Sequence, residues 1–284
     1  MKASFLRLSA LTIAWAVLTS PASGDTVQVN GFEMYYETAG QGQPLVLLHG
    51  FTQTGAIWDP IKDELVTTGY QVVIPDLRGH GSSTNPSGEF SHRQSAVDIF
   101  ALLDALGLER VQAMGISTGG MTLLHMATQQ PDRIDSMVLI GATTYFPEQA
   151  REIQRSMDPN NIPEGQMREL REIHKHGDKQ IRALISQFNA FKDSYDDMNF
   201  TRPYLSTIIA RTLVVQGDRD RFFPVKIALE MYDAIPRSYL WIVPNGGHVP
   251  TDGPMQEHFM CTATAFLSDR WRTGGPGEPA RLCE

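Results

Sequence analysis

The 284-residue sequence has only two cysteines, no run of basic residues and no low-complexity segment. Acidic side chains number 32 against 24 basic ones, which gives a formal net charge of −8. Such a surface repels phosphate groups, so we expect no nucleic-acid partner. Hydrophobic residues make up 42% of the chain and charged residues 20%, a composition that supports one full-sized core and excludes extensive disorder.

No apolar run reaches the ~20 residues that a membrane-spanning helix requires. An apolar run over residues 8–18 follows Lys2 and Arg7 and precedes a stretch of small residues. This order is typical of a secretory signal peptide, whereas the run is short for an uncleaved anchor. We predict a signal peptide over residues 1–24, with cleavage after Ala22 nearly as favourable as cleavage after residue 24. The mature protein is then secreted or periplasmic and has no stable membrane span.

The two cysteines, Cys261 and Cys283, lie near the C-terminus, with a segment rich in glycine and proline between them. An oxidising compartment permits a disulfide that would hold this segment against the last helix. Two separate thiols fit the sequence equally well. Neither cysteine lies in a recognisable nucleophile motif.

Short apolar runs alternate with helical patterns along most of the chain. The apolar runs predict strands that are buried on both faces, at residues 45–48, 72–74, 111–116, 137–140, 213–215 and 240–243. Two further strands flank a turn, at residues 26–29 and 32–38. Helices are predicted around residues 99–106, 120–130, 225–234 and 256–270. This alternation predicts an α/β fold with a doubly wound, mostly parallel, eight-stranded sheet.

One segment interrupts the alternation. From Phe146 to about Ser206 the sequence lacks a strand pattern and is rich in charged, aromatic and methionine side chains. So long a segment exceeds a plain crossover between two strands. We predict a helical cap over about residues 146–206, with an apolar underside on the carboxyl edge of the sheet, inserted into a single domain over residues 25–284. A surface excursion that packs only on itself is the alternative.

A G-x-S-x-G pentapeptide from Gly115 to Gly119 follows one predicted strand and precedes a predicted helix. The tight turn needs small residues two positions before and after the serine, and the serine oxygen then stands clear of the backbone. A chain of this length contains the pentapeptide by chance roughly one time in ten, so its position between a strand and a helix carries the inference. Ser117 is therefore the candidate nucleophile.

A serine hydroxyl is a poor nucleophile without a base. His248 follows the strand at 240–243, and both Asp218 and Asp220 follow the strand at 213–215. Serine, acid and histidine in this chain order suit a catalytic triad built on such a turn. His248 would accept the serine proton and later protonate the leaving group, while a carboxylate would fix its tautomer. The residues alone leave Asp218 and Asp220 both open as that carboxylate.

These motifs resemble the α/β-hydrolase superfamily, in its capped group of esterases, lactonases, C–C hydrolases, cofactor-free haloperoxidases and aminopeptidases. The matching segments cover nearly the whole mature chain and are His49-Gly50-Phe51 with Trp58, Asp76 to Ser83, Gly115 to Gly120, Pro131 to Ile134, Gly217 to Asp220 with Pro224, and Gly247-His248. The resemblance implies the α/β-hydrolase fold. It also implies that Asp220, last in the family's G-x-x-D pattern, is the acid.

The resemblance further implies an oxyanion hole formed by the backbone N–H groups of Phe51 and Thr118. Thr118 stands where the family often has methionine or glutamine, which makes the pocket wall smaller and more polar. His49, with Asp76, Arg78 and His80, is interpreted as organising loops around the site. The H-x-H of residues 174–176 lacks a third ligand in view, and we predict no metal and no cofactor.

The implied activity is hydrolysis of a small carboxylic ester or lactone through an acyl-enzyme on Ser117. A serine at the elbow, in place of an aspartate, argues against haloalkane dehalogenase and epoxide hydrolase chemistry. The alternatives that keep the triad are C–C bond hydrolysis, amide or peptide cleavage, and perhydrolysis. A non-catalytic ligand-binding receptor is an alternative from another class. The expected partner is a small ester-like molecule, and the sequence does not define the oligomeric state.

Overall fold

A computed structural model describes residues 23–270. They form an eight-stranded sheet in the order β1-β2-β4-β3-β5-β6-β7-β8. Its strands are β1 (Ser23–Val29), β2 (Phe32–Ala39), β3 (Gln43–Leu48), β4 (Tyr70–Pro75), β5 (Val111–Ile116), β6 (Ile134–Ile140), β7 (Arg211–Gly217) and β8 (Ser238–Val243). The pairs β1–β2 and β2–β4 are antiparallel and all others are parallel. The predicted fold class is confirmed.

The predicted hairpin begins closer to the N-terminus than its alternation indicated. β1 starts at Ser23, which pairs with Thr38, and the turn has positive φ angles of 44° at Asn30 and 80° at Gly31. Both angles suit the tight hairpin turn that an Asn-Gly pair favours. Cleavage after residue 24 would remove the first two residues of β1, whereas cleavage after residue 22 would leave the strand whole. The rest of the predicted signal peptide lies outside the described residues.

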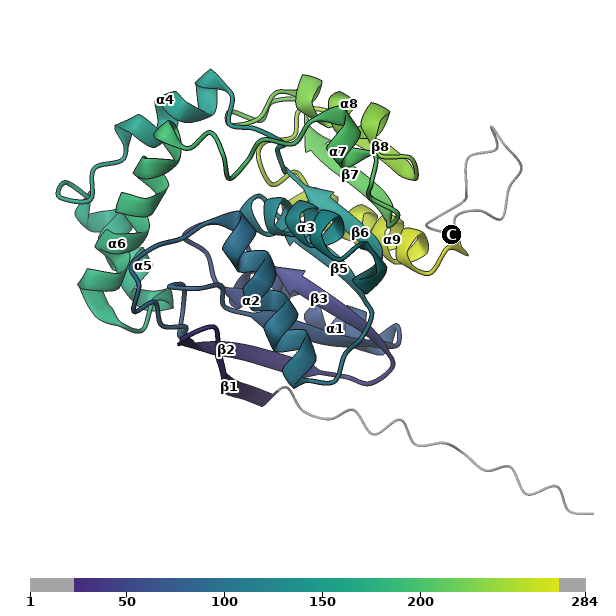
Figure 1. The fold of residues 1–284 in the computed structure, drawn as a ribbon, viewed down its shortest axis with the longest axis horizontal. Helices are drawn as coiled ribbons and strands as arrows, with labels where there is room; N and C mark the ends of the chain where they lie inside the picture. The colour runs from purple at the N-terminus through teal and green to yellow at the C-terminus, as the bar shows by residue number, and fades with distance from the viewer. Residues whose placement is uncertain (1–22, 271–284) are drawn as a thin grey trace, which may run out of the picture.

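Helices cover both faces of the sheet (Figure 1). One core packs under α2 (His92–Ala105), α3 (Thr118–Gln129) and α8 (Val225–Ala234), and the other under α1 (Asp59–Thr67) and α9 (Gln256–Leu267). Residues 45–48 of β3 alternate between the two cores, which explains why this part of the strand is apolar without interruption. Helix α9 ends at residue 267, three residues before the predicted end, and α1 was not predicted.

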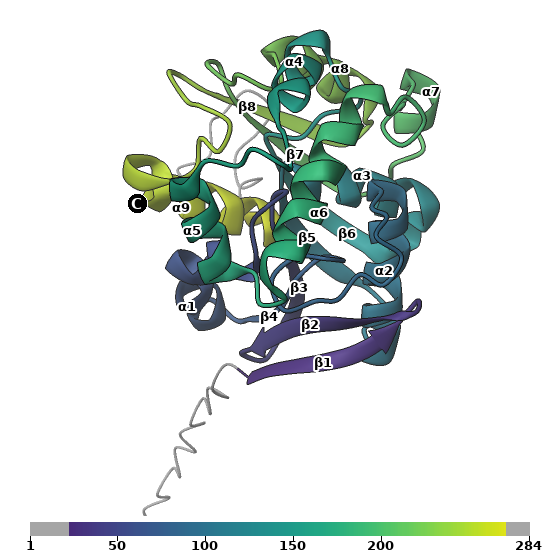
Figure 2. The same cartoon turned by 90° about the vertical axis from the view of Figure 1, so that its left-hand side faces the viewer.

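Four helices lie between β6 and β7, in the segment 146–206 that we call the cap segment. They are α4 (Glu148–Ser156), α5 (Glu164–Ile173), α6 (Gly177–Ala190) and α7 (Arg202–Leu205). Helices α4, α5 and α6 lie to the left of the strands in Figure 1, and α6 lies in front of the strands when that side faces the viewer in Figure 2. This arrangement leaves the carboxyl ends of the parallel strands facing the cap segment.

The cap segment is fastened to the sheet domain through Asp197. The backbone N–H groups of His92 and Arg93, in the first turn of α2, donate to its carboxylate at 2.8 and 3.0 Å. The His92 ring lies 2.6 Å from the same carboxylate. Burial raises the pKa of Asp197, but the charge and hydrogen bond of His92 and the two amides outweigh it, so the pKa lies well below its ordinary value. The interaction therefore anchors the cap segment as a charged group.

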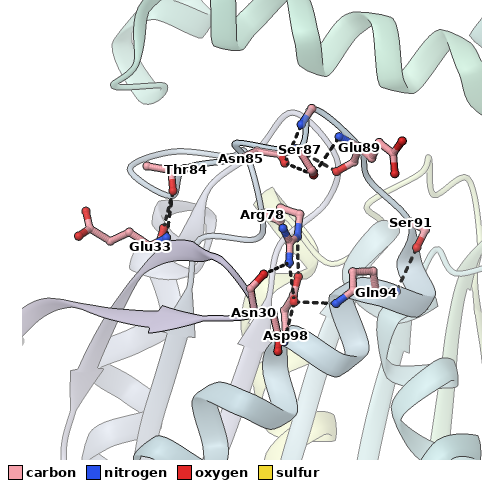
Figure 3. A network of polar contacts seen from close by, with 11 residues as sticks. Asn30, Glu33, Arg78, Thr84, Asn85, Ser87, Glu89, Ser91, Gln94 and Asp98 are labelled. Carbon is pink, nitrogen blue, oxygen red and sulfur yellow. Dashed lines mark hydrogen bonds and ion pairs between the residues drawn. The ribbon is translucent and has the colours of Figure 1, made fainter.

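A buried ion pair fixes the loop that follows β4 to the sheet domain. Arg78 donates from Nε and Nη2 to the two carboxylate oxygens of Asp98 on α2, each at 2.8 Å (Figure 3). Asn30 and Gln94 donate to the same carboxylate, and the guanidinium lies 4.1 Å from the centre of the Phe32 ring. A two-pronged pair with satisfied oxygens holds one geometry. The loop that it fixes carries Gly81 and Ser82, which form hydrogen bonds with side chains of the cap segment.

No helix in the described range is long and apolar enough to cross a membrane. Cys261 lies in α9 and is not a free cysteine. Cys283 lies outside the described residues, together with the predicted tail.

Candidate active site

Ser117 stands at the junction of β5 and α3 with φ 49° and ψ −112°. A positive φ is rare for a residue with a side chain and persists where the surroundings impose it. The Ser117 N–H donates to the Ile140 carbonyl of β6 at 2.8 Å, which fixes the turn to the neighbouring strand. The predicted strand-to-helix placement of the serine is therefore present.

The glycines of the pentapeptide are required by close backbone approach. A Cβ added at Gly115 would lie 2.5 Å from backbone atoms of Gly119 and Gly120, and one added at Gly119 would lie 2.2 Å from the Leu48 carbonyl oxygen of β3. These separations are far inside van der Waals contact. Any side chain here would push α3 away from the sheet and displace Ser117.

The structure brings His248 and Asp220 together at the ends of β8 and β7. His248 Nδ1 donates to Asp220 Oδ2 at 2.9 Å. The Asp220 side chain is fully buried, and its other oxygen accepts from the Phe222 and Phe223 N–H groups at 2.7 and 3.2 Å. Gln216 Nε2 also donates to Oδ2, at 2.8 Å. The Asp220 carboxylate thus accepts from four donors, three of them besides His248.

These donors set the charge of the Asp220 side chain. Burial raises the pKa of Asp220, but its hydrogen bond to His248, the charge of that ring and the donors from Phe222 and Gln216 outweigh burial. The pKa of the Asp220 carboxyl therefore lies below its ordinary value. A carboxylate that stays ionised can stabilise a positively charged imidazole beside it.

Asp218 is placed differently. Its side chain is 30% exposed, and one of its carboxylate oxygens lies 3.9 Å from Arg219. Within the described residues it makes no hydrogen bond to His248. Of the two carboxylates that the sequence left open, only Asp220 reaches the histidine.

Two glycines allow the His248 loop to approach the sheet. A Cβ added at Gly217 would lie 2.1 Å from the Gly247 carbonyl oxygen, and one at Gly141 would lie 2.4 Å from that of His248. Gly141 also has a φ of 55°, which favours glycine. No motif in the sequence singles out Gly141. Its role in seating the histidine needed the packing of two distant loops.

The predicted oxyanion donors lie in the same cavity as Ser117 and His248. Within residues 23–270, neither the Phe51 nor the Thr118 backbone N–H donates to another protein group. His49 supports the first of them: its Nδ1 donates to the Gly50 carbonyl at 2.7 Å and its Nε2 accepts from the Leu77 N–H at 2.9 Å. Both N–H groups remain available for a developing negative charge.

His174 holds the next residue of this loop from the cap segment. Its Nδ1 accepts from the Gly81 N–H at 2.9 Å, and its Nε2 donates to the Thr52 carbonyl at 3.2 Å. Burial lowers the pKa of His174 to about 4, and burial lowers that of His49 to about 4 despite its bond to Gly50. Each ring uses one nitrogen as donor and the other as acceptor, which requires the neutral form.

We therefore expect the protein to lose stability as the pH falls from about 6.5 toward 4. In this window an unfolded histidine binds a proton while the folded His174 does not, so each such group lowers the unfolding free energy by on the order of 1–2 kcal/mol at pH 5. Urea unfolding at pH 7 and pH 5 should show a smaller loss for His174→Gln than for the wild type. Equal losses in the two proteins would contradict the assignment of His174 as a neutral tether.

The cavity that joins these groups has a volume of about 250 Å³. Its floor is the strand edge, with Ser117, Thr118, Phe51 and His248, and its roof is the cap segment. Apolar side chains dominate the lining and are Ile57, Ile116, Met121, Phe146, Met157, Ile185, Phe188, Phe191, Phe222, Phe223 and Val249. No lysine or arginine of the described chain lines it. The site suits a small, largely apolar, uncharged ligand.

Several residues at this site were absent from the sequence prediction. Phe222 and Phe223 contact the His248 ring, with centroids 4.6 and 5.3 Å away, and Gln216 donates to Asp220. No motif singles out these residues, although Gln216 directly precedes the G-x-x-D pattern. His176, the partner of His174 in the H-x-H, contacts the Ser82 carbonyl at 3.0 Å. The described residues contain no group of three or more side chains arranged to hold a metal ion.

Comparisons with known proteins agree with this fold. A family profile described as alpha/beta hydrolase fold matches residues 43–172. The chain is 28% identical to a 2-hydroxy-6-oxo-6-phenylhexa-2,4-dienoate hydrolase from Comamonas testosteroni, over 78% of this chain and 86% of that one. It is also 28% identical to a serine hydrolase from Mus musculus, over 78% and 79%. An esterase from Exiguobacterium antarcticum superposes with a TM-score of 0.71 at 23% identity, over 87% of this chain and all of that one.

Proposed function

Because the chain belongs to the α/β-hydrolase superfamily and is a hydrolase, we propose that it cleaves a small, uncharged carboxylic ester or lactone through an acyl-enzyme on Ser117. One observation carries the proposal. Ser117, the Asp220-bonded His248 and two unengaged backbone N–H groups all border one cavity. These are the nucleophile, base, acid and oxyanion donors that acyl transfer requires.

In this mechanism the Ser117 oxygen attacks the substrate carbonyl carbon and its proton passes to His248 Nε2. The negative oxygen that forms is stabilised by the N–H groups of Phe51 and Thr118. Collapse breaks the bond to the leaving alcohol, which takes the proton from His248 and leaves an acyl group on Ser117. Water, deprotonated by His248, then attacks the acyl carbonyl, the bond to the Ser117 oxygen breaks, and His248 returns the proton to that oxygen. Asp220 holds the imidazole in the required tautomer throughout.

The charge of the cavity favours an uncharged substrate. The Comamonas relative is named for a dienoate, which is a carboxylate. A carboxylate buried in an apolar cavity is best stabilised by a cationic partner, and no lysine or arginine of the described chain lines this one. We therefore place an ester or lactone ahead of a charged C–C hydrolase substrate. The same triad would also serve amide cleavage or perhydrolysis.

We also propose that the enzyme acts outside the cytoplasm, in the periplasm or the medium. Support comes from the charged, apolar and small-residue order of the first 24 residues.

We expect a fluorophosphonate probe to label the mature protein at Ser117, because only an activated serine attacks phosphorus rapidly. Ser117→Ala should abolish labelling, and mass spectrometry of the labelled peptide should identify the residue. Short uncharged p-nitrophenyl esters should be hydrolysed at least about tenfold faster than analogues with a carboxylate on the acyl chain. An unlabelled, folded wild-type protein would favour the receptor alternative, and a preference for the carboxylates would overturn the charge argument.

A further inference from the structure

Among the polar side chains that line the cavity and that the mechanism does not use, one is buried and has an unpartnered oxygen. Gln154 lies on α4 of the cap segment, lines the cavity and is only 1% exposed. Its backbone carbonyl accepts from Asn189 Nδ2 at 3.1 Å, which anchors the helix at this point. Its side-chain amide has no hydrogen-bond partner within residues 23–270, and its Oε1 is fully buried.

This lack of a partner distinguishes Gln154 from the polar residue one turn earlier on the same helix. Arg151 is also buried, and its guanidinium donates to the carbonyl groups of Phe146, Phe191, Lys192 and Ser194. Arg151 therefore joins parts of the cap segment through hydrogen bonds, whereas the Gln154 side chain forms none within the described residues. A buried amide without partners destabilises the fold, and an apolar side chain of equal size would avoid that cost.

Gln154 also stands apart from other buried polar groups. Several side chains of the described residues have a buried polar atom without a partner, among them Thr122, Ser136 and Gln112. Of all these, Gln154 is the one that lines the cavity shared by Ser117 and His248. A polar group kept without a partner at a binding site is explained when a ligand supplies the partner.

The surroundings of Gln154 define the class of ligand. Aromatic rings of Phe51, Phe146, Phe188 and Phe191 border the same cavity and contact one another at centroid separations of 5.1 to 6.1 Å. Such rings favour an aromatic group, which gains edge and face contacts. An amide offers both a donor and an acceptor, so its best match is a hydroxyl group, which offers the same pair.

We propose that Gln154 is a specificity-determining residue that binds the ring hydroxyl of an uncharged hydroxyaryl ester. This inference rests on the proposed function, because it assigns the substrate class of the same site. The hydroxyl would exchange hydrogen bonds with the Gln154 amide while the aryl ring packs among the phenylalanines. An analogue with a methyl group in place of the hydroxyl would leave the amide unpaired in the complex and bind more weakly.

Binding without turnover tests the proposal separately from catalysis. The ligands are methyl 2-, 3- and 4-hydroxybenzoate, each beside the analogue with a methyl group in place of the hydroxyl. Titration calorimetry on full-length Ser117→Ala protein should give, for at least one isomer, a Kd roughly 10- to 100-fold lower than that of its methyl partner. Adding Gln154→Met should reduce this ratio to about one. Adding Gln149→Met, a change on the same helix outside the cavity, should leave the ratio unchanged.

Stability gives a second measurement. Gln154→Met should keep or raise the thermal midpoint, since it removes an unpaired buried amide, whereas a structural role for that amide predicts a lower midpoint. A ratio near one for all three isomers with Ser117→Ala protein, or a ratio that survives Gln154→Met, would overturn the proposal. Neither result depends on labelling of Ser117, so failure of the proposed hydrolysis would be recognised independently.

Discussion

Replacing Asp220 with asparagine should lower kcat by about 10⁴-fold without unfolding the protein. The reason lies in the donors around the carboxylate. Two backbone N–H groups, from Phe222 and Phe223, point at Oδ1, so the oxygen of an asparagine must remain at that position. The new NH₂ group would then face His248 Nδ1 in place of an acceptor.

The histidine can respond in only one way. To avoid two opposed donors, Nδ1 must become the acceptor and the ring proton must move to Nε2. A ring protonated at Nε2 cannot take the proton of Ser117, so the base is lost although every side chain keeps its place. Gln216, which donates to Oδ2 at 2.8 Å, makes the substitution still less favourable because it also loses its acceptor.

Asp218→Asn is the matched control. It changes the same chemical group two residues away, on a side chain that does not bond to His248, and should leave kcat within about twofold of the wild type. The measurement is kcat for the best p-nitrophenyl ester, with circular dichroism to verify folding. A large loss in Asp218→Asn and a small one in Asp220→Asn would reassign the acid.

The choice between these aspartates illustrates what the sequence can and cannot predict. Both follow the same strand, and spacing along the chain gives them equal access to a histidine loop. The geometry of the turn distinguishes the two aspartates. One oxygen of Asp220 accepts from the backbone N–H groups two and three residues later in the chain, so the other oxygen points at His248. Resemblance to the superfamily also indicated Asp220, whereas the residue pattern alone did not distinguish it from Asp218.

Elements of the sheet were predictable for a physical reason. Strand segments covered by helices on both faces are apolar without interruption, as at residues 45–48 of β3, and stand out in any sequence. Helix α1 was missed because only Ile61 and Leu65 of its nine residues are buried, so its apolar pattern is sparse. The role of His174 was also unpredictable, since its partners Gly81 and Thr52 are about 90 to 120 residues away in sequence.

Gly119→Ala should lower the unfolding free energy by about 3–5 kcal/mol and remove most activity. The added Cβ would overlap the Leu48 backbone of β3, at 2.2 Å from its oxygen and 2.6 Å from its carbon. Neither partner can move alone, because Leu48 is hydrogen-bonded within the sheet and Gly119 lies in the first turn of α3. The helix start must shift outward, and the shift carries Ser117 and the Thr118 N–H with it.

Gly165→Ala separates this overlap from the general effect of losing a glycine. Gly165 lies in α5, and an added Cβ would meet nothing within 4 Å, so the change should raise stability by about 0.5–1 kcal/mol. Urea unfolding of both variants beside the wild type would measure the difference. If Gly119→Ala stayed within about 0.5 kcal/mol of the wild type, α3 would have to pack less tightly against β3 than the structure indicates. Close contact between α3 and β3 would then not explain why glycine occupies the position two residues after Ser117.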